Sequence, residues 1–137
     1  MASPPLGHPP RILVVMPAQW PRALLRAELR EHGYDAAGAR DLLEALSEGE
    51  SSEGPVRLML VDQDALGEGD PKLLHDLLDR LVAHHEGAVV VLLAGTMHQA
   101  PDGPWQQVLR RPMSISEIVA AIQQTVPLPP AERHPLD

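Results

Sequence analysis

Leu58-Met59-Leu60-Val61-Asp62, or LMLVD at residues 58–62, is the stretch that decides the fold. Its apolar residues stand together without polar alternation, and the run ends in a carboxylate. Such a run is typical of a strand that is buried on both faces of a parallel sheet. Similar runs occur at residues 12–15 (ILVV) and 89–93 (VVVLL), so we expect three central parallel strands.

Segments with helical spacing alternate with these strands. In the first segment, Pro21 stands in the opening turn and Gly33 follows the last turn. We expect Leu24, Leu25 and Leu29 to share the buried face of this helix. Three more helices are predicted, from about residue 41 to the breaker cluster at 51–55, from the Asp70-Pro71 start to Gly87, and from the capping box of Ser114 and Glu117 onward.

Two weaker strands, near 34–38 and 107–110, complete the alternation. Glycine and proline are frequent at 95–104, so the helix before the last strand is expected to be short or missing. The whole pattern predicts an α/β fold with a parallel sheet, right-handed crossovers and helices on both faces. Sites in such folds lie beyond the carboxyl ends of the strands.

Composition excludes several classes of function. The chain has 137 residues, 44% of them apolar, which fits one domain of ordinary size. Its 19 acidic and 11 basic residues give a net charge of −8, which repels nucleic acid and anionic membrane surfaces. The absence of cysteine excludes disulfides and thiol chemistry. No apolar run could cross a bilayer and no secretory signal is visible, so we expect a cytoplasmic protein.

Proline marks the two ends of the chain. Eight of the 15 prolines fall within residues 1–10 and 127–137, where they oppose both helix and sheet. We therefore predict a folded domain at 11–126 between disordered, proline-rich tails.

Residues that follow the strands indicate which sites to expect. Met16 and Pro17 follow the first strand, where no glycine fingerprint or phosphate-binding lysine stands, so nucleotide and flavin sites are not expected. The histidines lack metal-ligand spacing and the serines lack a nucleophile context, so we expect no metal site, no catalytic residue and no enzyme activity. Asp62 either caps the following turn or is a reactive or metal-binding carboxylate.

Several short stretches together resemble the receiver domain of two-component response regulators, over about residues 11–125. The resemblance implies a flavodoxin-like, doubly wound, five-stranded parallel sheet and a role in signal transduction. The stretches that carry it are RILVV (11–15), EHGYDA (31–36), DLLEAL (41–46), LMLVD (58–62) and RRPMSISEIVAAI (110–122).

The resemblance assigns Asp62 to the phosphate-accepting aspartate of the family. The other site positions carry residues of different chemistry: Met16 and Pro17 in place of the acidic pair that helps hold Mg²⁺, Leu93 in place of the switch Ser or Thr, and Arg111 in place of the Lys before Pro. Met16 and Pro17 cannot bind a metal, so Mg²⁺ is not expected as a cofactor. The chain thus resembles a degenerate receiver, or pseudo-receiver.

Other family features are displaced or lost. Thr96 could serve as the switch residue only if the register slips, and the switch aromatic matches Val108. Lys72 is the one lysine and is predicted to lie in the third helix, so it cannot replace Arg111. If the Arg111 guanidinium reaches Asp62, a bidentate pair would hold one conformation permanently.

The leading interpretation is a signalling module that works by protein contact without phosphorylation. Trp20 and Trp105, expected in loops at the same end of the sheet, are candidate partner contacts, or each covers core left open by the short helix. The expected partner is a histidine kinase, a regulator or a second copy of the chain. One alternative is a receiver that accepts phosphoryl on Asp62. Another is a small-ligand sensor with an apolar hollow lined by Met16, Pro17 and Leu93.

Overall fold

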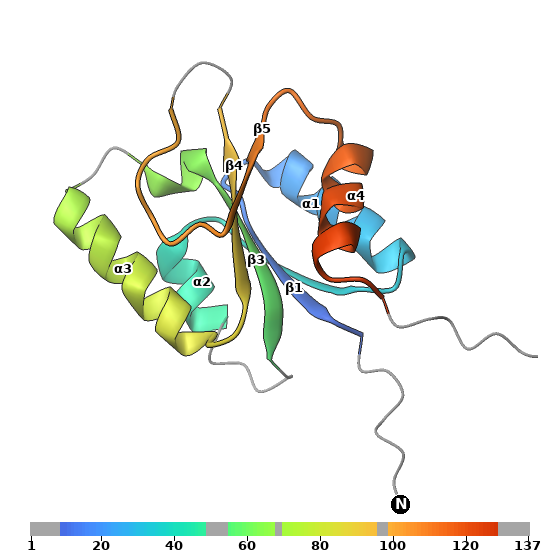
Figure 1. Cartoon of the computed structure of the whole chain (residues 1–137), viewed down its shortest axis with the longest axis horizontal. Helices are drawn as coiled ribbons and strands as arrows, with labels where there is room; N and C mark the ends of the chain where they lie inside the picture. The colour runs from blue at the N-terminus through green and yellow to red at the C-terminus, as the bar shows by residue number, and fades with distance from the viewer. Residues whose placement is uncertain (1–8, 49–54, 68–69, 96–98, 129–137) are drawn as a thin grey trace, which may run out of the picture.

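The structure, a computed structural model, describes residues 9–48, 55–67, 70–95 and 99–128. Within them, five strands form one parallel sheet in the order β2-β1-β3-β4-β5 (Figure 1). The strands are β1 (Arg11–Val15), β2 (Asp35–Ala39), β3 (Val56–Asp62), β4 (Val89–Ala94) and β5 (Gln107–Arg110). The helices are α1 (Gln19–Glu31), α2 (Leu42–Glu48), α3 (Pro71–His84) and α4 (Ile115–Thr125), and a short 3-10 helix, η1 (Gln63–Leu66), follows β3. The predicted doubly wound sheet is confirmed.

Helices cover both faces of the sheet, with α1 and α4 on one side and α2 and α3 on the other (Figure 1). Side chains of β3 alternate between the two cores. Leu58 and Leu60 pack on the α1/α4 side, whereas Met59 and Val61 pack on the α2/α3 side. Because both faces of β3 are covered, its sequence is apolar without interruption.

Helix α1 differs in part from the prediction. It begins two residues before Pro21, so Trp20 lies in the first helical turn and not in a loop. Leu25 and Leu29 are buried, whereas Leu24 is exposed. Residues four apart lie on one side of a helix, but neighbouring residues are turned by about 100°. The predicted shared face is therefore wrong for Leu24.

The start of α4 follows the predicted capping box. Ser114 Oγ accepts a hydrogen bond from the Glu117 backbone N–H at 3.0 Å, and Glu117 Oε1 accepts one from the Ser114 N–H at 2.8 Å. At the start of α3, Asp70 Oδ1 accepts from the Lys72 N–H, again as predicted. Among the described residues, no helix has the length and apolar content of a membrane span.

The connection from β4 to β5 contains no helix in its described part, residue 95 and residues 99–106. Ala100 and Trp105 instead pack against the core on the α2/α3 side. Trp105 is held there because its Nε1 donates to the Pro101 carbonyl at 2.8 Å. An irregular, bent segment thus covers the core where the resemblance places a further helix.

The packed unit extends slightly past the predicted domain bounds. The Pro10 carbonyl accepts a hydrogen bond from the Asp35 backbone N–H at 3.0 Å, next to the β1–β2 ladder. Leu128 packs against the core on the α1/α4 side. The remaining residues of the two predicted tails, 1–8 and 129–137, lie outside the described residues.

His85, at the end of α3, makes stability depend on pH. Its side chain is buried, and within the described residues its Nε2 has no hydrogen-bond partner. Burial lowers the pKa of His85 below its ordinary value of 6.5, and the charges of His84 and Arg11 lower it further. The unfolded chain therefore binds a proton more readily than the folded chain. The free energy of unfolding should be highest above about pH 6.5 and should fall as the pH drops below it.

Denaturant unfolding between about pH 7.5 and 5 measures this slope. His85→Leu should flatten it in the upper part of that range, where carboxylates do not yet titrate. His75→Gln, at an exposed position on the same helix, serves as the control for the loss of a histidine. Equal slopes for the wild type and His85→Leu would contradict the assignment.

Candidate functional site

Asp62 is the last residue of β3 and lies at the carboxyl edge of the sheet. Only 2% of its surface is exposed. Its Oδ1 accepts a hydrogen bond from the Asp64 backbone N–H at 2.9 Å, so the side chain caps η1. Burying an ionised carboxylate is costly unless a cation or several donors compensate it. The capping bond alone does not supply that compensation.

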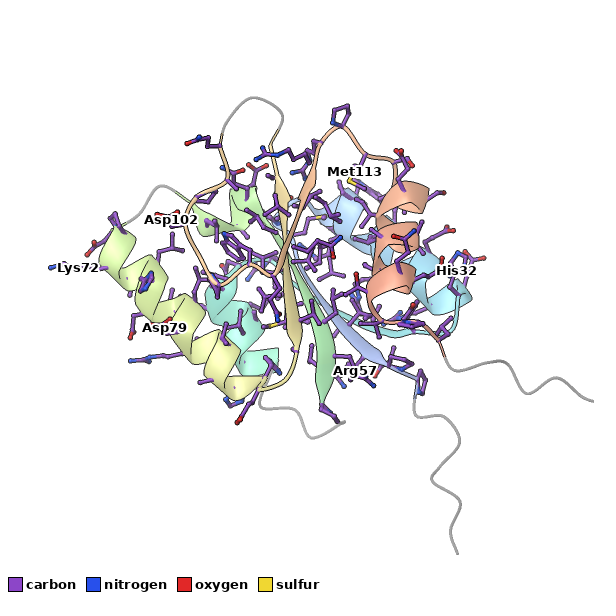
Figure 2. All side chains as sticks on the ribbon, in the orientation of Figure 1. His32, Arg57, Lys72, Asp79, Asp102 and Met113 are labelled. Carbon is purple, nitrogen blue, oxygen red and sulfur yellow. The ribbon has the colours of Figure 1, made fainter. Side chains whose placement is uncertain are left out.

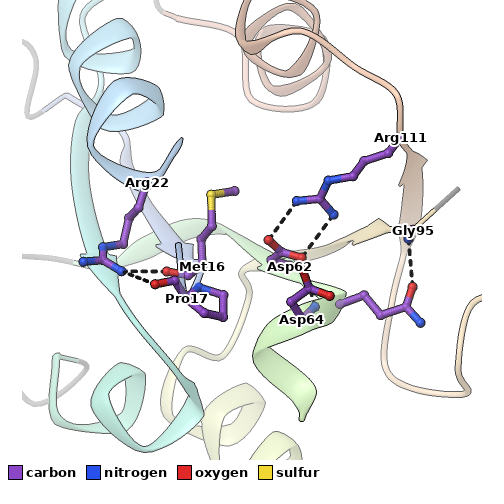
Figure 3. A network of polar contacts seen from close by, with 8 residues as sticks. Met16, Pro17, Arg22, Asp62, Asp64, Gly95 and Arg111 are labelled. Carbon is purple, nitrogen blue, oxygen red and sulfur yellow. Dashed lines mark hydrogen bonds and ion pairs between the residues drawn. The ribbon is translucent and has the colours of Figure 1, made fainter. Parts of the chain in front are cut away.

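Arg111 supplies the missing charge. Its Nη2 donates to Oδ2 of Asp62 at 2.8 Å, and its Nη1 donates to Oδ1 at 3.1 Å (Figure 3). This is the two-point geometry in which guanidinium and carboxylate pair most strongly, and it is the contact that the sequence raised as a hypothesis. The hydrogen bond to Asp62 raises the pKa of Arg111 above its ordinary value, against partial burial, and the charges of Asp62 and Asp64 add to the effect.

The sheet register brings the two side chains together across β4. Asp62 is level with Leu93 of β4, and Leu93 is level with Leu109 of β5. The Arg111 backbone N–H donates to the Ala94 carbonyl at 3.1 Å, which continues the ladder one step past β5. Arg111 is thus anchored at the carboxyl edge and reaches back to Asp62. Leu93, which the resemblance assigns to the switch position, is buried and pairs with Asp62 in the sheet.

The small-ligand alternative expected Met16, Pro17 and Leu93 to line an apolar hollow, and the structure differs. The side chain of Met16 is buried in the core, as is that of Leu93, so these two residues do not line an open apolar hollow. That part of the sensor alternative is wrong, because Met16 and Leu93 fill space between the sheet and its helices.

Met16 and Pro17 make polar contacts through their backbone. Arg22 Nη1 donates to the carbonyl oxygens of Met16 at 2.7 Å and Pro17 at 3.3 Å (Figure 3).

Gln63 was not identified as a site residue from the sequence. Its Oε1 accepts a hydrogen bond from the Gly95 backbone N–H at 2.9 Å, so it ties η1 to the end of β4 (Figure 3). The only available signal in the sequence was that Gln63 directly follows Asp62. Together with Arg111, this contact fastens the ends of three neighbouring strands.

Residues around Asp62 do not fit Mg²⁺. That ion prefers six oxygen ligands in near-octahedral geometry and is usually held by one or two carboxylates. Met16 and Pro17 offer no side-chain oxygen, and both carboxylate oxygens of Asp62 already accept hydrogen bonds. Across the described ranges, no three His, Asp or Glu side chains are grouped so that they could hold a metal.

The remaining predicted positions lie away from the pair. Lys72 points outward at the start of α3 (Figure 2). Val108 is partly exposed on β5, and Thr96 lies outside the described residues. Trp20 and Trp105 are not at the same end of the sheet, because Trp105 lies two residues before the amino end of β5. Trp20 follows the carboxyl end of β1 and is 74% exposed.

Solved structures share this arrangement of strands and helices. The receiver domain of the hybrid histidine kinase CckA matches with a TM-score of 0.63 and 24% identity, covering 83% of this chain and 96% of that one. A CheY-like receiver domain protein from Methanospirillum hungatei matches with a TM-score of 0.68 and 16% identity, covering 85% and 93%. The chain has the fold of a response regulator receiver domain. No family model and no curated protein matches it by sequence.

A third matching structure contains a phosphorylated aspartic acid, which is the modification to compare with the Asp62 site. It is a response regulator from Burkholderia pseudomallei, determined with a phosphorylated aspartic acid and a calcium ion. The match has a TM-score of 0.65 and 18% identity and covers 85% of this chain and 68% of that one. At these identities the likeness establishes the fold, and the chemistry of this chain has to be argued from its own residues.

The pair predicts a measurable coupling between Asp62 and Arg111. Asp62→Asn keeps an acceptor for the Asp64 N–H but leaves Arg111 without its counter-charge. A double-mutant cycle of Asp62→Asn and Arg111→Gln should give a coupling of about 1–3 kcal/mol in the free energy of unfolding, because one partner is buried and the other is 33% exposed by side chain.

The exposed ion pair of Asp76 and Arg80 on α3, with N···O at 3.1 Å, is the matched control. The same cycle on that pair should give about 0.5 kcal/mol or less, since solvent screens it. Equal coupling in the two cycles, measured by denaturant unfolding, would contradict the assigned importance of the Asp62–Arg111 pair.

Proposed function

We propose that this chain is a pseudo-receiver: a signalling domain with the receiver fold that acts through protein contact, without phosphoryl transfer. The observation that carries the proposal is the bidentate contact of Arg111 with Asp62. Both oxygens of the carboxylate that would accept a phosphoryl group are hydrogen-bonded to a guanidinium of the same chain. The guanidinium of Arg111 therefore already contacts the carboxylate to which phosphorylation would add negative charge.

The chemistry of phosphoryl transfer supports this reading. Transfer relies on Mg²⁺ and fixed cations that neutralise the oxygens of the moving group. Here the metal-ligand positions of the family carry Met16 and Pro17, and Arg111 binds the acceptor itself in a rigid fork that a lysine cannot form. An attacking oxygen of Asp62 would first have to break a buried, charge-assisted bond. We infer that the domain has no catalytic activity and needs no metal cofactor.

Contact with a partner requires an exposed surface, and α1 offers one. Trp20 and Leu24 lie one turn apart on this helix, and both are exposed. A pair spaced by four residues forms a continuous apolar stripe on a helix, and tryptophan is enriched at the energetic centres of interfaces. We propose Trp20 as a partner contact. Trp105 is instead packed against the core, so its expected role is structural.

The proposed partner is a signalling protein, such as a histidine kinase or another regulator, or a second copy of this chain. A net charge of −8 disfavours nucleic acid and anionic membrane surfaces as partners. The same charge opposes self-association, so a second copy would need a large apolar contact. The competing candidate is a receiver that accepts phosphoryl on Asp62, which the following experiment separates from the proposal.

Incubation with acetyl phosphate and Mg²⁺, followed by intact-mass measurement, tests the proposal. The wild-type chain is expected to show no added phosphoryl group, because Arg111 occupies the acceptor and no carboxylate follows β1. Asp62→Asn is the control for modification elsewhere. A phosphoryl group that appears on the wild type and is lost in Asp62→Asn would establish the phosphorylatable receiver instead.

A further inference from the structure

A groove between α2 and α3 contains a second exposed apolar pair. Leu43 of α2 is 64% exposed and Leu73 of α3 is 57% exposed, and both line one groove of about 160 Å³. The helices α2 and α3 that line it lie on the face of the sheet opposite the one that α1 covers (Figure 1). An exposed leucine is common by itself, but two that face the same hollow form a surface for an apolar group.

The floor of the groove is part of the packed core. Leu66 of η1 is buried at its base, and Leu74 and Leu77 of α3 line its wall. η1 is held in place because Asp62 caps it and Gln63 ties it to Gly95. The hollow is therefore preformed. Its volume matches one large apolar side chain, since a cavity of roughly 150 Å³ holds a benzene-sized group.

Among the described residues, the charged side chains that line the groove are of one sign. They are two carboxylates, Asp41 and Asp70, with no basic side chain. Both carboxylates cap helices: Asp41 Oδ1 accepts from the Glu44 N–H at 2.9 Å and Asp70 Oδ1 from the Lys72 N–H at 3.0 Å. Their positions are thus set by the backbone. An incoming apolar group therefore meets a negative rim.

The arginines nearest to the start of α2 and along α3 do not neutralise that rim. Arg40 pairs with Glu44 at 3.1 Å, and Arg80 pairs with Asp76 at 3.1 Å. Arg40, which precedes α2, is balanced by Glu44 of that helix, and Arg80 is balanced by Asp76 of α3. The two lining carboxylates remain as the local excess of charge.

We propose that this groove binds an amphipathic helix of another protein, with a leucine-sized anchor in the hollow and arginine or lysine beside Asp41 and Asp70. Helix-in-groove binding uses apolar anchors at helical spacing, and complementary charge sets the orientation. A second copy of this chain fits less well. The arginines of its exposed helix α1 donate to backbone carbonyls of their own copy: Arg22 to Met16, and Arg26 and Arg30 to Ala36.

This inference does not depend on whether Asp62 can accept a phosphoryl group, because the unmodified Asp62 that caps η1 is common to both candidate functions. It would hold for a phosphorylatable receiver as well, so the phosphorylation assay and the groove experiment can fail separately. The groove would be a docking surface on the side of the sheet opposite α1, and its ligand would be an amphipathic, basic helix.

A synthetic helical peptide tests the groove directly. The probe carries leucine at positions i, i+3, i+4 and i+7 and arginine on the flanking positions, and a matched peptide carries glutamate in place of arginine. Fluorescence anisotropy measures the affinity of each for the full chain. The arginine peptide is expected to bind at least about tenfold more tightly than the glutamate peptide. Equal affinities would overturn the assignment of charge.

Variants locate the binding. Leu43→Ser with Leu73→Ser should weaken the arginine peptide at least about tenfold, while Leu24→Ser, an exposed leucine on the other face, should leave its affinity unchanged. Asp41→Asn with Asp70→Asn keeps both helix caps and should weaken binding a few-fold, more at low salt. No binding of the peptide, or loss in Leu24→Ser instead of the groove variant, would overturn the proposal.

Discussion

A carboxylate buried at the end of a central strand has to be neutralised, and in this chain the guanidinium of Arg111 neutralises it. The two side chains are 49 residues apart in sequence, and the parallel register of β3, β4 and β5 brings them to the same edge. Leaving Asp62 unpaired at 2% exposure would cost more free energy than most single interactions supply. The pair therefore constrains the carboxyl edge of the sheet. It also constrains η1, which Asp62 caps, and the end of β4, which Gln63 of η1 contacts at Gly95.

The same pair determines what the receiver fold can do here. A lysine is a mobile point charge that can bind an added phosphoryl oxygen, whereas the arginine fork holds both oxygens of the acceptor. Phosphorylation would have to exchange one strong contact for another without the metal-binding carboxylates that lower the barrier. Under the function that we propose, a domain fixed in this way conveys information by what it binds. Its exposed apolar residues on α1 and in the α2/α3 groove lie on opposite faces of the sheet and could engage different partners.

Sequence reasoning predicted those features that depend on local pattern. Uninterrupted apolar runs identified the buried strands, and Ser114 with Glu117 identified the start of α4, because caps and burial act over a few residues. The contact of Arg111 with Asp62 was a hypothesis from the family resemblance, which assigns both residues to the same site, and the structure contains it. The faces of α1, the place of Trp105 and the Gln63–Gly95 bond were not predicted. They depend on where a helix starts and how a loop crosses the sheet, which tertiary packing decides.

Amide and arginine side-chain NMR, with Mg²⁺ and then beryllofluoride added, tests the central claim most directly. Beryllofluoride mimics a phosphoryl group and adds to a competent receiver aspartate. If Arg111 holds both oxygens of Asp62, the guanidinium signals of Arg111 should stay in place and the amides of Asp62, Asp64 and Leu93 should not shift. Release of the Arg111 signals with shifts centred on Asp62 would contradict the account and would show that the site accepts a phosphoryl group.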